Sequence, residues 1–224
     1  MQGTARRMVQ TLAISKELTS MAAVQERFDL RYATDDRFFT EWFEDLPVLT
    51  EGDRTTLAYL QQRFFEHRHR GSLPEGTVDK LIVSPLLDLA GLYDARFTLR
   101  TEAQVEIVLK DREELLQGRI DTLILQEQLW VLVVEAKNTT LSLSVAIPQA
   151  LTYMMAGSSG DHPIFGVVTN GDEFRFIKLL KLPATSPYFD LSDIFSLLPP
   201  HRSKLEQVLQ VLKQINRTLT DFDR

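Results

Sequence analysis

The stretch LWVLVVEAK at residues 129–137, with GRID before it at residues 118–121, decides the fold of this 224-residue chain. Both stretches read as strands because Val, Leu and Ile dominate them. They nevertheless carry three charged side chains, Asp121, Glu135 and Lys137. Burial of an unpaired charge is costly or shifts its pKa, so charges on buried strands require a partner, a metal ion or the rim of a sheet.

The spacing of these charges predicts that they face one another. Side chains alternate along a strand, so Glu135 and Lys137 share a face with Val131 and Val133. The polar turn at 126–128 joins the two strands and predicts an antiparallel hairpin. With three residues in the loop, Asp121 opposes Val133 and lies roughly 7–8 Å from Glu135 on the same face. A two-residue loop would turn Asp121 to the other face, so a shared cation requires an odd-length loop.

Two carboxylates and a lysine in this arrangement suit the hydrolysis of a phosphodiester. Mg²⁺ takes oxygen ligands, usually one or two carboxylates completed by water and substrate phosphate. Asp121 and Glu135 supply these carboxylates, and the Ala136 backbone carbonyl can add a third protein ligand. Lys137 can orient or deprotonate the attacking water, and we expect its pKa to be lowered by partial burial near the metal. The expected cofactor is Mg²⁺, with Mn²⁺ as a substitute.

The same residues resemble the core of the PD-(D/E)xK nuclease superfamily, in which an Asp on one strand precedes an Asp/Glu-x-Lys on the next. Asp121 and Glu135-Ala136-Lys137 match, whereas Ile120 stands at the Pro position. The stretch PQALTY at 148–153 resembles the Gln-x-x-x-Tyr signature of the RecB-like branch, and GVVTNG at 166–171 resembles a strand of type I restriction endonuclease R subunits. Over about residues 72–181, the chain is similar to the nuclease domain of those subunits, in a stand-alone form.

This resemblance implies a restriction-endonuclease-like α/β (α+β) fold, with a mixed sheet flanked by helices, and a metal-dependent DNA endonuclease. It further implies that Gln149 and Tyr153 position the scissile strand or Lys137. On the residues alone, they form an i, i+4 pair on a helix capped by Ser144, with Pro148 in its first turn and Gly157 at its end. A Tyr packed at the domain edge and hydrogen-bonded by the Gln is an equal alternative.

A fourth acid is a candidate for the site. Residues 75–89 read as an amphipathic helix ending at Gly91. Glu75 lies about 40° from the centre of its apolar face and Asp79 about 80°, so Glu75 is preferred as a further metal ligand or water-orienting residue. An acid that only complements the helix dipole is at least as good an interpretation of Glu75.

The remaining pattern predicts three segments. Residues 1–71 form a helical N-terminal extension, with helices at about 7–25, 37–44 and, from a Thr50 capping box, to about His67. Residues 72–182 form the nuclease core in the order α-β-β-β-α-β-β, with an Asn170-Gly171 hairpin turn. Residues 183–224 form a loop and a helix with an apolar stripe, which packs on the core or pairs two subunits. The members of the stripe are Leu205, Val208, Leu212, Ile215 and Leu219.

Composition limits the alternatives. The absence of cysteine excludes disulfides and thiolate metal sites, and four scattered histidines form no zinc motif. No apolar run reaches membrane-spanning length, so we expect a cytoplasmic protein without membrane contact. No Gly-x-x-x-x-Gly-Lys-Ser/Thr loop is present, which excludes a nucleotide cofactor of that kind and the motor that accompanies this domain in R subunits. The stretch GSSG at 157–160 reads as a loop after a helix.

The charge balance argues against nuclease activity. At a formal net charge of −6, the chain has no overall basic surface for DNA, so local clusters must serve. Candidates are Arg63 with the run at 67–70, and Arg96 with Arg100. The alternative is a catalytically silent module that binds nucleic acid or protein on a nuclease scaffold. In a third interpretation, Asp121 and Lys137 form only a structural ion pair.

Overall fold

The computed structural model describes residues 10–109, 114–127, 129–157 and 162–221. Within these residues, nine strands form one mixed sheet in the order β1-β4-β5-β6-β7-β8-β2, with β3 also paired to β4 and β9 to β7. The strands are β1 (Gln10–Ala13), β2 (Arg31–Tyr32), β3 (Phe97–Leu109), β4 (Glu114–Gln126), β5 (Leu129–Ala136), β6 (Ile164–Thr169), β7 (Glu173–Leu180), β8 (Tyr188–Leu191) and β9 (Phe195–Ser196). The fold is therefore the expected α/β arrangement, a mixed sheet flanked by helices.

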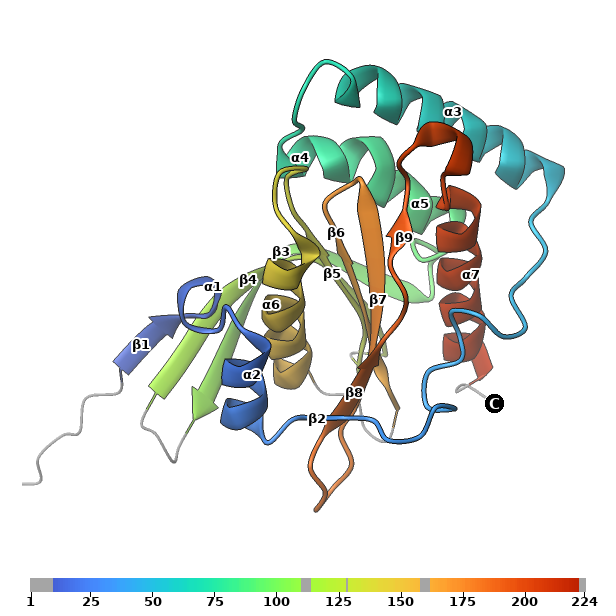
Figure 1. Ribbon diagram of the computed structural model, residues 1–224. Coiled ribbons are helices and arrows are strands. Elements are labelled where there is room, and N and C mark those ends of the chain that lie inside the picture. Colours follow the sequence, from blue (N-terminus) through green and yellow to red (C-terminus); the bar gives the residue numbers. More distant parts are fainter. Residues whose placement is uncertain (1–9, 110–113, 128, 158–161, 222–224) are drawn as a thin grey trace, which may run out of the picture.

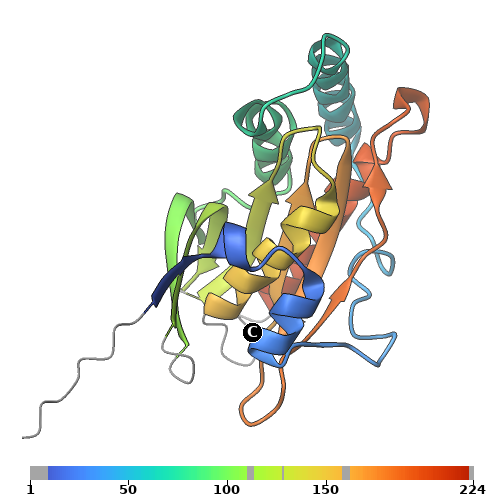
Figure 2. The same ribbon diagram turned by 60° about the vertical axis from the view of Figure 1, so that its left-hand side comes forward.

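Helices cover both faces of the sheet (Figures 1 and 2). They are α1 (Ile14–Glu17), α2 (Met21–Phe28), α3 (Glu51–Arg68), α4 (Glu75–Val78), the π-helical segment η1 (Asp79–Val83), α5 (Ser84–Leu89), α6 (Leu143–Ala156), the 3₁₀ turn η3 (Pro200–Arg202) and α7 (Leu205–Asp221). From residue 72 to β7, the order α-β-β-β-α-β-β is confirmed. Parallel strands need a crossover, and α6 supplies it between β5 and β6.

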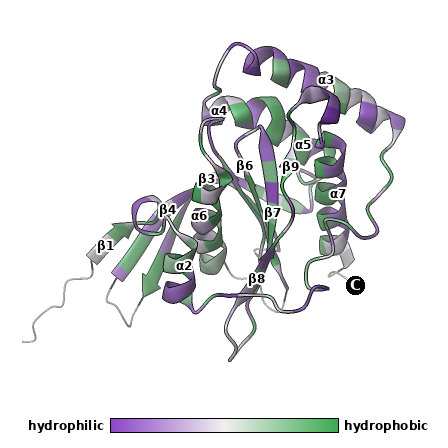
Figure 3. Cartoon of the chain, in the orientation of Figure 1, coloured by the Kyte–Doolittle hydropathy of each residue, from purple (hydrophilic) through white to green (hydrophobic). Residues whose placement is uncertain are grey.

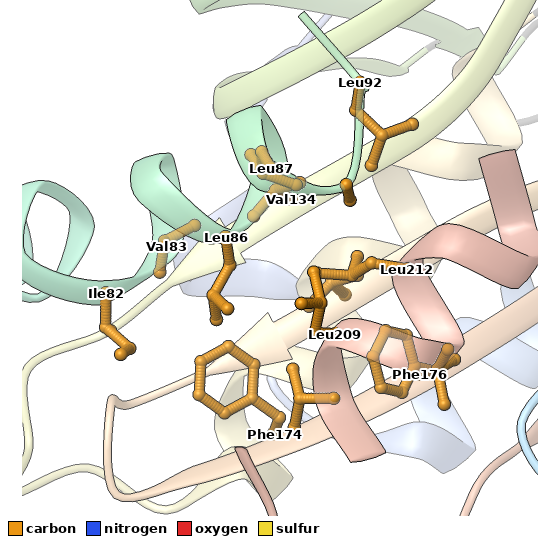
Figure 4. Close-up of a cluster of buried hydrophobic side chains, with 14 of the residues drawn as sticks. Ile82, Val83, Leu86, Leu87, Leu92, Val134, Phe174, Phe176, Leu209 and Leu212 are labelled. Atoms are coloured by element: carbon orange, nitrogen blue, oxygen red, sulfur yellow. The ribbon is translucent and has the colours of Figure 1, made fainter. Parts of the chain in front are cut away.

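Each face of the sheet has its own hydrophobic core. The first core packs α3, the α4–α5 helix and α7 against the sheet, and Figure 4 shows Leu86, Leu212 and Phe174 meeting there. The second core lies under α6, α1 and α2 and contains Ile147, Leu151 and Val133. Colouring by hydropathy shows the largely hydrophilic α3 on the outside of the first layer (Figure 3). Membership of one core or the other therefore tells which way a strand residue points.

The C-terminal helix packs on the chain's own core. All five residues of its apolar stripe are at most 1% exposed and belong to the first core. Ser203 precedes the helix, and its hydroxyl accepts a hydrogen bond from the Leu205 backbone N–H. The stripe is thus used within one chain, and it offers no apolar seam to a second copy.

The prediction of an all-helical N-terminal extension is wrong. Where one helix was expected over 7–25, the described part contains β1, α1 and α2; residues 7–9 lie outside the described residues. Strand β1 forms because residues 10–13 pair in parallel with residues 114–117 of β4, and this pairing overrides helical propensity. Ser20 then caps a new helix by accepting a hydrogen bond from the Ala23 N–H.

Two further expectations on the segments flanking the core have different outcomes. The helix expected at 37–44 is wrong, since only turns occur there, and Lys178 holds this region by donating to the Phe38 carbonyl and the Glu41 carboxylate. The Thr50 capping box is confirmed, with reciprocal hydrogen bonds between Thr50 and Asp53 at the start of α3. Strands β1, β2, β8 and β9 lie outside residues 72–182, so the sheet draws on all three expected segments.

Candidate active site

The β4–β5 hairpin brings Asp121 and Glu135 together by a route that differs from the expected one. Gln126 pairs with Leu129, which leaves only residues 127 and 128 between the paired positions; residue 128 lies outside the described residues. The expected three-residue loop is therefore wrong. The strand pairing then shifts by one residue between Leu125, opposite Trp130, and Ile124, opposite Leu132.

This β-bulge offsets the effect of the short loop on the register, so that Asp121 again lies on the same face of the hairpin as Glu135. Val131 is the extra residue, and beyond it Thr122 pairs with Val134. Asp121 therefore lies opposite Glu135. The expected register had placed it opposite Val133. Because of the bulge, Val131 belongs to the first core, whereas Val133 belongs to the second. Glu135 keeps the expected alternation with Val133 and faces the α6 layer.

Hydrogen bonds hold the three charged residues in place. The Ala136 backbone N–H donates to Asp121 Oδ2 over 2.8 Å. Lys137 Nζ donates to Glu135 Oε1 in an ion pair. The interpretation of Asp121 and Lys137 as a structural ion pair required a contact with Asp121, so the partner of the lysine differs from that interpretation. Glu135 is fully buried, and its second oxygen, Oε2, has no hydrogen-bond partner among the described residues. A buried carboxylate oxygen without a donor is a free ligand for a cation.

Glu75 reaches the same site from the opposite layer. It is the first residue of α4, which continues through η1 and α5 as the helix expected over 75–89 and ends before Gly91, at φ +74°. Glu75 lines the same cavity as Asp121, Glu135 and Lys137, whereas Asp79 does not line it. The preference for Glu75 over Asp79 as a site residue is thus consistent with its position.

Gln149 and Tyr153 enter the site from α6. The helix begins after Ser142 and not after the expected Ser144, so Pro148 lies inside it and not in its first turn. Its C-cap is Gly157, as expected. Tyr153 is 1% exposed, and its hydroxyl accepts hydrogen bonds from Gln149 Nε2 (2.8 Å) and from the Arg119 backbone N–H (3.3 Å). The packed tyrosine with its glutamine partner is therefore confirmed, and both residues line the cavity, while their role in positioning substrate or Lys137 stays a prediction.

A break in the sheet creates the cavity. On the side of β4 away from β3, β1 pairs with residues 114–117 and β5 with residues 122–126, leaving 118–121 between them. Tyr153 satisfies the Arg119 N–H in this interval. Gly118 makes room for the tyrosine, because a Cβ there would lie 2.6 Å from Tyr153 Cε1. The cavity measures about 710 Å³.

Several residues of this cavity had not been expected in the site. Ala13 and Ser15 come from the junction of β1 and α1, and Gln104 and Arg119 from the β3–β4 hairpin. Figure 2 shows β1 and α1 beside this hairpin. No sequence signal could have placed Ser15 here, because the contact depends on the long-range pairing of β1 with β4.

Burial and crowding of like charges dominate the electrostatics. Burial raises the pKa of Glu135 to about 8, and the charge of Asp121 adds to the effect. Burial and, next, the charge of Glu75 together raise the pKa of Asp121 to about 6, against the lowering effect of the Ala136 hydrogen bond. A cation near these groups would favour their ionised forms and offset the repulsion between them, so the electrostatics of the site favour binding of positive charge.

The expectation of a lowered lysine pKa is wrong for the protein without bound metal. Burial lowers the pKa of Lys137, but the carboxylates of Glu135, Asp121 and Glu75 outweigh it, and the net shift is upward. Lys137 is therefore an ammonium group in this state. In this state it can donate hydrogen bonds and supply positive charge, and it can act as a general base only after it has lost a proton.

The donor set fits a hard cation that keeps much of its water. No group of three or more His, Cys, Asp or Glu side chains stands ready to hold a metal within the described ranges. Mg²⁺ needs only one or two carboxylates with waters, and Asp121 with the unpartnered Glu135 Oε2 meets that need. The Ala136 carbonyl as a ligand stays a prediction.

The basic clusters expected to contact DNA are partly used within the fold. Arg68 forms an ion pair with Asp172, and Arg96 donates to Asn216 and stacks on Phe97. His67, His69 and Arg70 are exposed at the end of α3. The cationic residues that line the cavity, among the described residues, are Lys137 and Arg119, and the Arg119 side chain is largely exposed and contacts Glu102.

Comparison with known proteins identifies the family. Residues 43–184 match the model for the N terminus of the type I restriction enzyme R protein, which is more than half of the chain. The chain belongs to this R-protein N-terminal family. The match includes Glu75, Asp121, Glu135, Lys137, Gln149 and Tyr153, whereas β1 and α1, which complete the cavity, precede it.

Other comparisons add little to the family assignment. Among solved structures, one match is described as a fragment of an HsdR subunit of a type I restriction enzyme from Vibrio vulnificus YJ016, at 18% identity and a TM-score of 0.38. The alignment covers 62% of this chain and 26% of that one, so the chain corresponds to about a quarter of it. No curated protein matches the chain. No helix among the described residues is long and apolar enough to cross a membrane.

Proposed function

We propose that this protein is a Mg²⁺-dependent DNA endonuclease, in which Mn²⁺ can substitute. Membership of the R-protein N-terminal family supports a nuclease related to type I restriction. The observation that carries the proposal is the convergence of Asp121, Glu135 and Lys137, from two strands, on one cavity with an unpartnered carboxylate oxygen. DNA as substrate, partner subunits that deliver it, and a cytoplasmic location belong to the same proposal.

The metal would be held by Asp121 and Glu135, with Glu75 as a further ligand or water-orienting group. When bound, Mg²⁺ supplies Lewis acidity toward the scissile phosphate and its attacking water. The Ala136 N–H fixes one oxygen of Asp121, and the Asp121 carboxyl group is also in hydrogen-bond contact with Glu75. Glu135 is held by Lys137 through one oxygen and offers the second. Glu135 is thus oriented through one oxygen and available through the other.

Lys137 would act on the substrate as a cation. Its ammonium group lies at the cavity and can donate to a non-bridging phosphate oxygen or hold the attacking water. Water attacks phosphorus, the bond to the leaving nucleotide oxygen breaks, and the proton of the water passes to solvent or to that oxygen. Positive charge beside the phosphate offsets the negative charge that builds up during attack.

Gln149 and Tyr153 would position this machinery. Tyr153 is too buried to receive much of the substrate, and its hydroxyl fixes the Arg119 backbone within two residues of Asp121. Gln149 is half-buried at the cavity and orients the tyrosine. The pair therefore supports the unpaired part of β4 on which the metal ligand lies.

Cleavage of supercoiled, linear and single-stranded DNA with Mg²⁺ or Mn²⁺ tests the proposal. We expect metal-dependent cutting by the wild type and its loss in Asp121→Ala and Lys137→Ala at matched thermal stability. Glu66→Ala, on the exposed face of α3, is the matched control and should cut normally. Absence of cutting on every substrate, together with absence of metal binding by titration, would replace the nuclease by a catalytically silent binding module.

A further inference from the structure

An irregularity in the β3–β4 ladder lies directly opposite Asp121. The strands pair at Thr101 with Thr122 and at Ala103 with Ile120, but the positions between these pairs, Glu102 and Asp121, are not paired. Glu102 has φ +51°, in the left-handed region. A glutamate rarely adopts this conformation, and in the middle of a 13-residue strand it interrupts the extended backbone.

Side-chain orientation on β4 reverses at this point. Before it, the even-numbered Leu116 and Ile120 point into the core under α6. After it, the odd-numbered Leu123 and Leu125 point into that core, while Ile124 belongs to the opposite one. A regular strand would keep one parity throughout. The reversal therefore falls between Ile120 and Leu123, where Asp121 lies.

Strand β3 reverses in step with β4. Phe97 belongs to the core on the far side of the sheet, whereas Ala103, Val105 and Ile107 pack on the α6 side. All four are odd-numbered, so the change in parity lies between 97 and 103, the interval that contains Glu102. Because the register is otherwise constant from Phe97 to Leu109, both strands turn over together and pairing resumes on either side.

This reversal determines which way Asp121 points. If β4 kept the alternation set by Leu116 and Ile120, Asp121 would project away from the α6 layer, on the exposed side with Arg119. With the reversal, it shares a face with Leu123, where it meets Glu135 and accepts the hydrogen bond from Ala136. We propose that the left-handed backbone at Glu102 is the positioning device that turns Asp121 into the active site.

The role assigned to Glu102 belongs to its backbone and not to its carboxylate. Its side chain is 71% exposed and contacts Arg119, which is 62% exposed, at 3.6 Å. Such a pair is weak in water. The inference rests on the proposed function for its catalytic meaning, since Asp121 is a metal ligand only if the protein is a nuclease. The orientation of Asp121 can nevertheless be tested without metal or DNA.

Three substitutions at this position separate backbone from charge. Glu102→Gly and Glu102→Asn both remove the carboxylate but accept the left-handed conformation, so both should retain the site. Glu102→Val removes the carboxylate and resists that conformation because it is β-branched, so it should turn Asp121 away. An effect of charge would appear in all three variants alike.

The first measurement is amide hydrogen exchange by NMR in the metal-free protein. Loss of Asp121 from the site would deprive the Ala136 N–H of its acceptor, so its exchange in Glu102→Val should be about tenfold faster or more. The neighbouring Lys137 N–H, bound to the Thr169 carbonyl, is the internal reference and should not change. Unchanged exchange at Ala136 in folded Glu102→Val would overturn the inference.

Glu102→Gly keeps the inference testable if the valine variant does not fold. At a left-handed position, glycine relieves strain and should leave the melting temperature unchanged or higher, whereas Arg100→Gly, at an extended exposed position of the same strand, should lower it. Equal losses in both would contradict a left-handed Glu102. Metal-dependent cleavage by Glu102→Gly and Glu102→Asn but not Glu102→Val would extend the result to function. Absence of cleavage in the wild type would contradict the proposed nuclease function but not the role of Glu102 in orienting Asp121.

Discussion

Asp121 Oδ2 accepts a hydrogen bond of 2.8 Å from the backbone N–H of Ala136, the residue between Glu135 and Lys137. This bond links the two strands of the hairpin at the point where their regular pairing ends. It also leaves the side chains of Glu135 and Lys137, on either side of Ala136, directed to the face on which Asp121 lies. The candidate centre is therefore fixed by backbone geometry as well as by charge.

The pKa values of the two acids predict an unusual dependence of stability on pH. Glu135 has a pKa of about 8 and Asp121 of about 6 when folded, against ordinary values of 4.5 and 3.8. The folded state thus binds more protons than the unfolded state between about pH 4 and pH 8, so the free energy of unfolding falls as pH rises through this window. At about 1.4 kcal/mol per pKa unit, the expected loss over this window is several kcal/mol.

Thermal unfolding of the metal-free protein over that pH range measures this effect. The stability of Glu135→Gln should vary less with pH than that of the wild type, because glutamine cannot ionise. Mg²⁺ should recover most stability at the alkaline end, where both acids are charged. Identical pH profiles for Glu135→Gln and wild type would show that Glu135 does not carry the shift.

Lys137→Gln should separate chemistry from metal binding. It removes the cation beside the phosphate, and we expect cleavage to fall by roughly 10²-fold or more. It also frees Glu135 Oε1 from its ion pair, so Mg²⁺ affinity by titration should be retained or increased. Parallel losses of metal affinity and cleavage would instead assign Lys137 a structural role.

Gln149→Ala and Tyr153→Phe should act as a unit. Both remove the hydrogen bond that joins the two side chains, and Tyr153→Phe also leaves the Arg119 N–H without its acceptor, at a cost of about 1 kcal/mol of stability. In a double-mutant cycle on cleavage rate, the double variant should lose less than the sum of the single losses. Strict additivity would indicate that Gln149 contacts DNA independently of Tyr153.

Gly118→Ala should perturb the site through packing alone. The new Cβ would lie 2.6 Å from the Tyr153 ring, so the tyrosine or β4 must shift, at a cost of about 1–3 kcal/mol. Gly76→Ala is the control, since no atom lies within 4 Å of a Cβ there. Chemical denaturation of both variants measures the difference. Equal stability of Gly118→Ala and wild type would show that the tyrosine can move freely.

The site residues could be predicted because the alternation of side chains along strands limits where charges can meet. Asp121, Glu135 and Lys137 follow from that rule, whereas Gln149 and Tyr153 are assigned to the site through the resemblance to the Gln-x-x-x-Tyr signature, which their i, i+4 spacing accompanies. The length of the loop between β4 and β5 and the register of their pairing could not be predicted. A two-residue turn corrected by a bulge at Val131 gives the same parity as a three-residue loop, and the sequence does not distinguish them.

Long-range contacts account for the other differences. Residues 10–13 form a strand because β4 offers them an edge, and local propensity does not indicate this pairing. The upward pKa shift of Lys137 depends on three carboxylates that come from separate parts of the chain. The left-handed backbone at Glu102 also has no signal in its residue type, since glycine or asparagine would be the usual choice.

The position of β1 has a practical consequence for any shortened form of this protein. The family match begins at residue 43 and ends at residue 184, so a recombinant fragment cut to those limits would lack β1, α1 and α7. It would expose the faces on which Ile14 and Leu212 are now buried, and it would be prone to aggregation during purification. Fragments for crystallisation or fusion should therefore be chosen by the edges of the sheet, from β1 through α7.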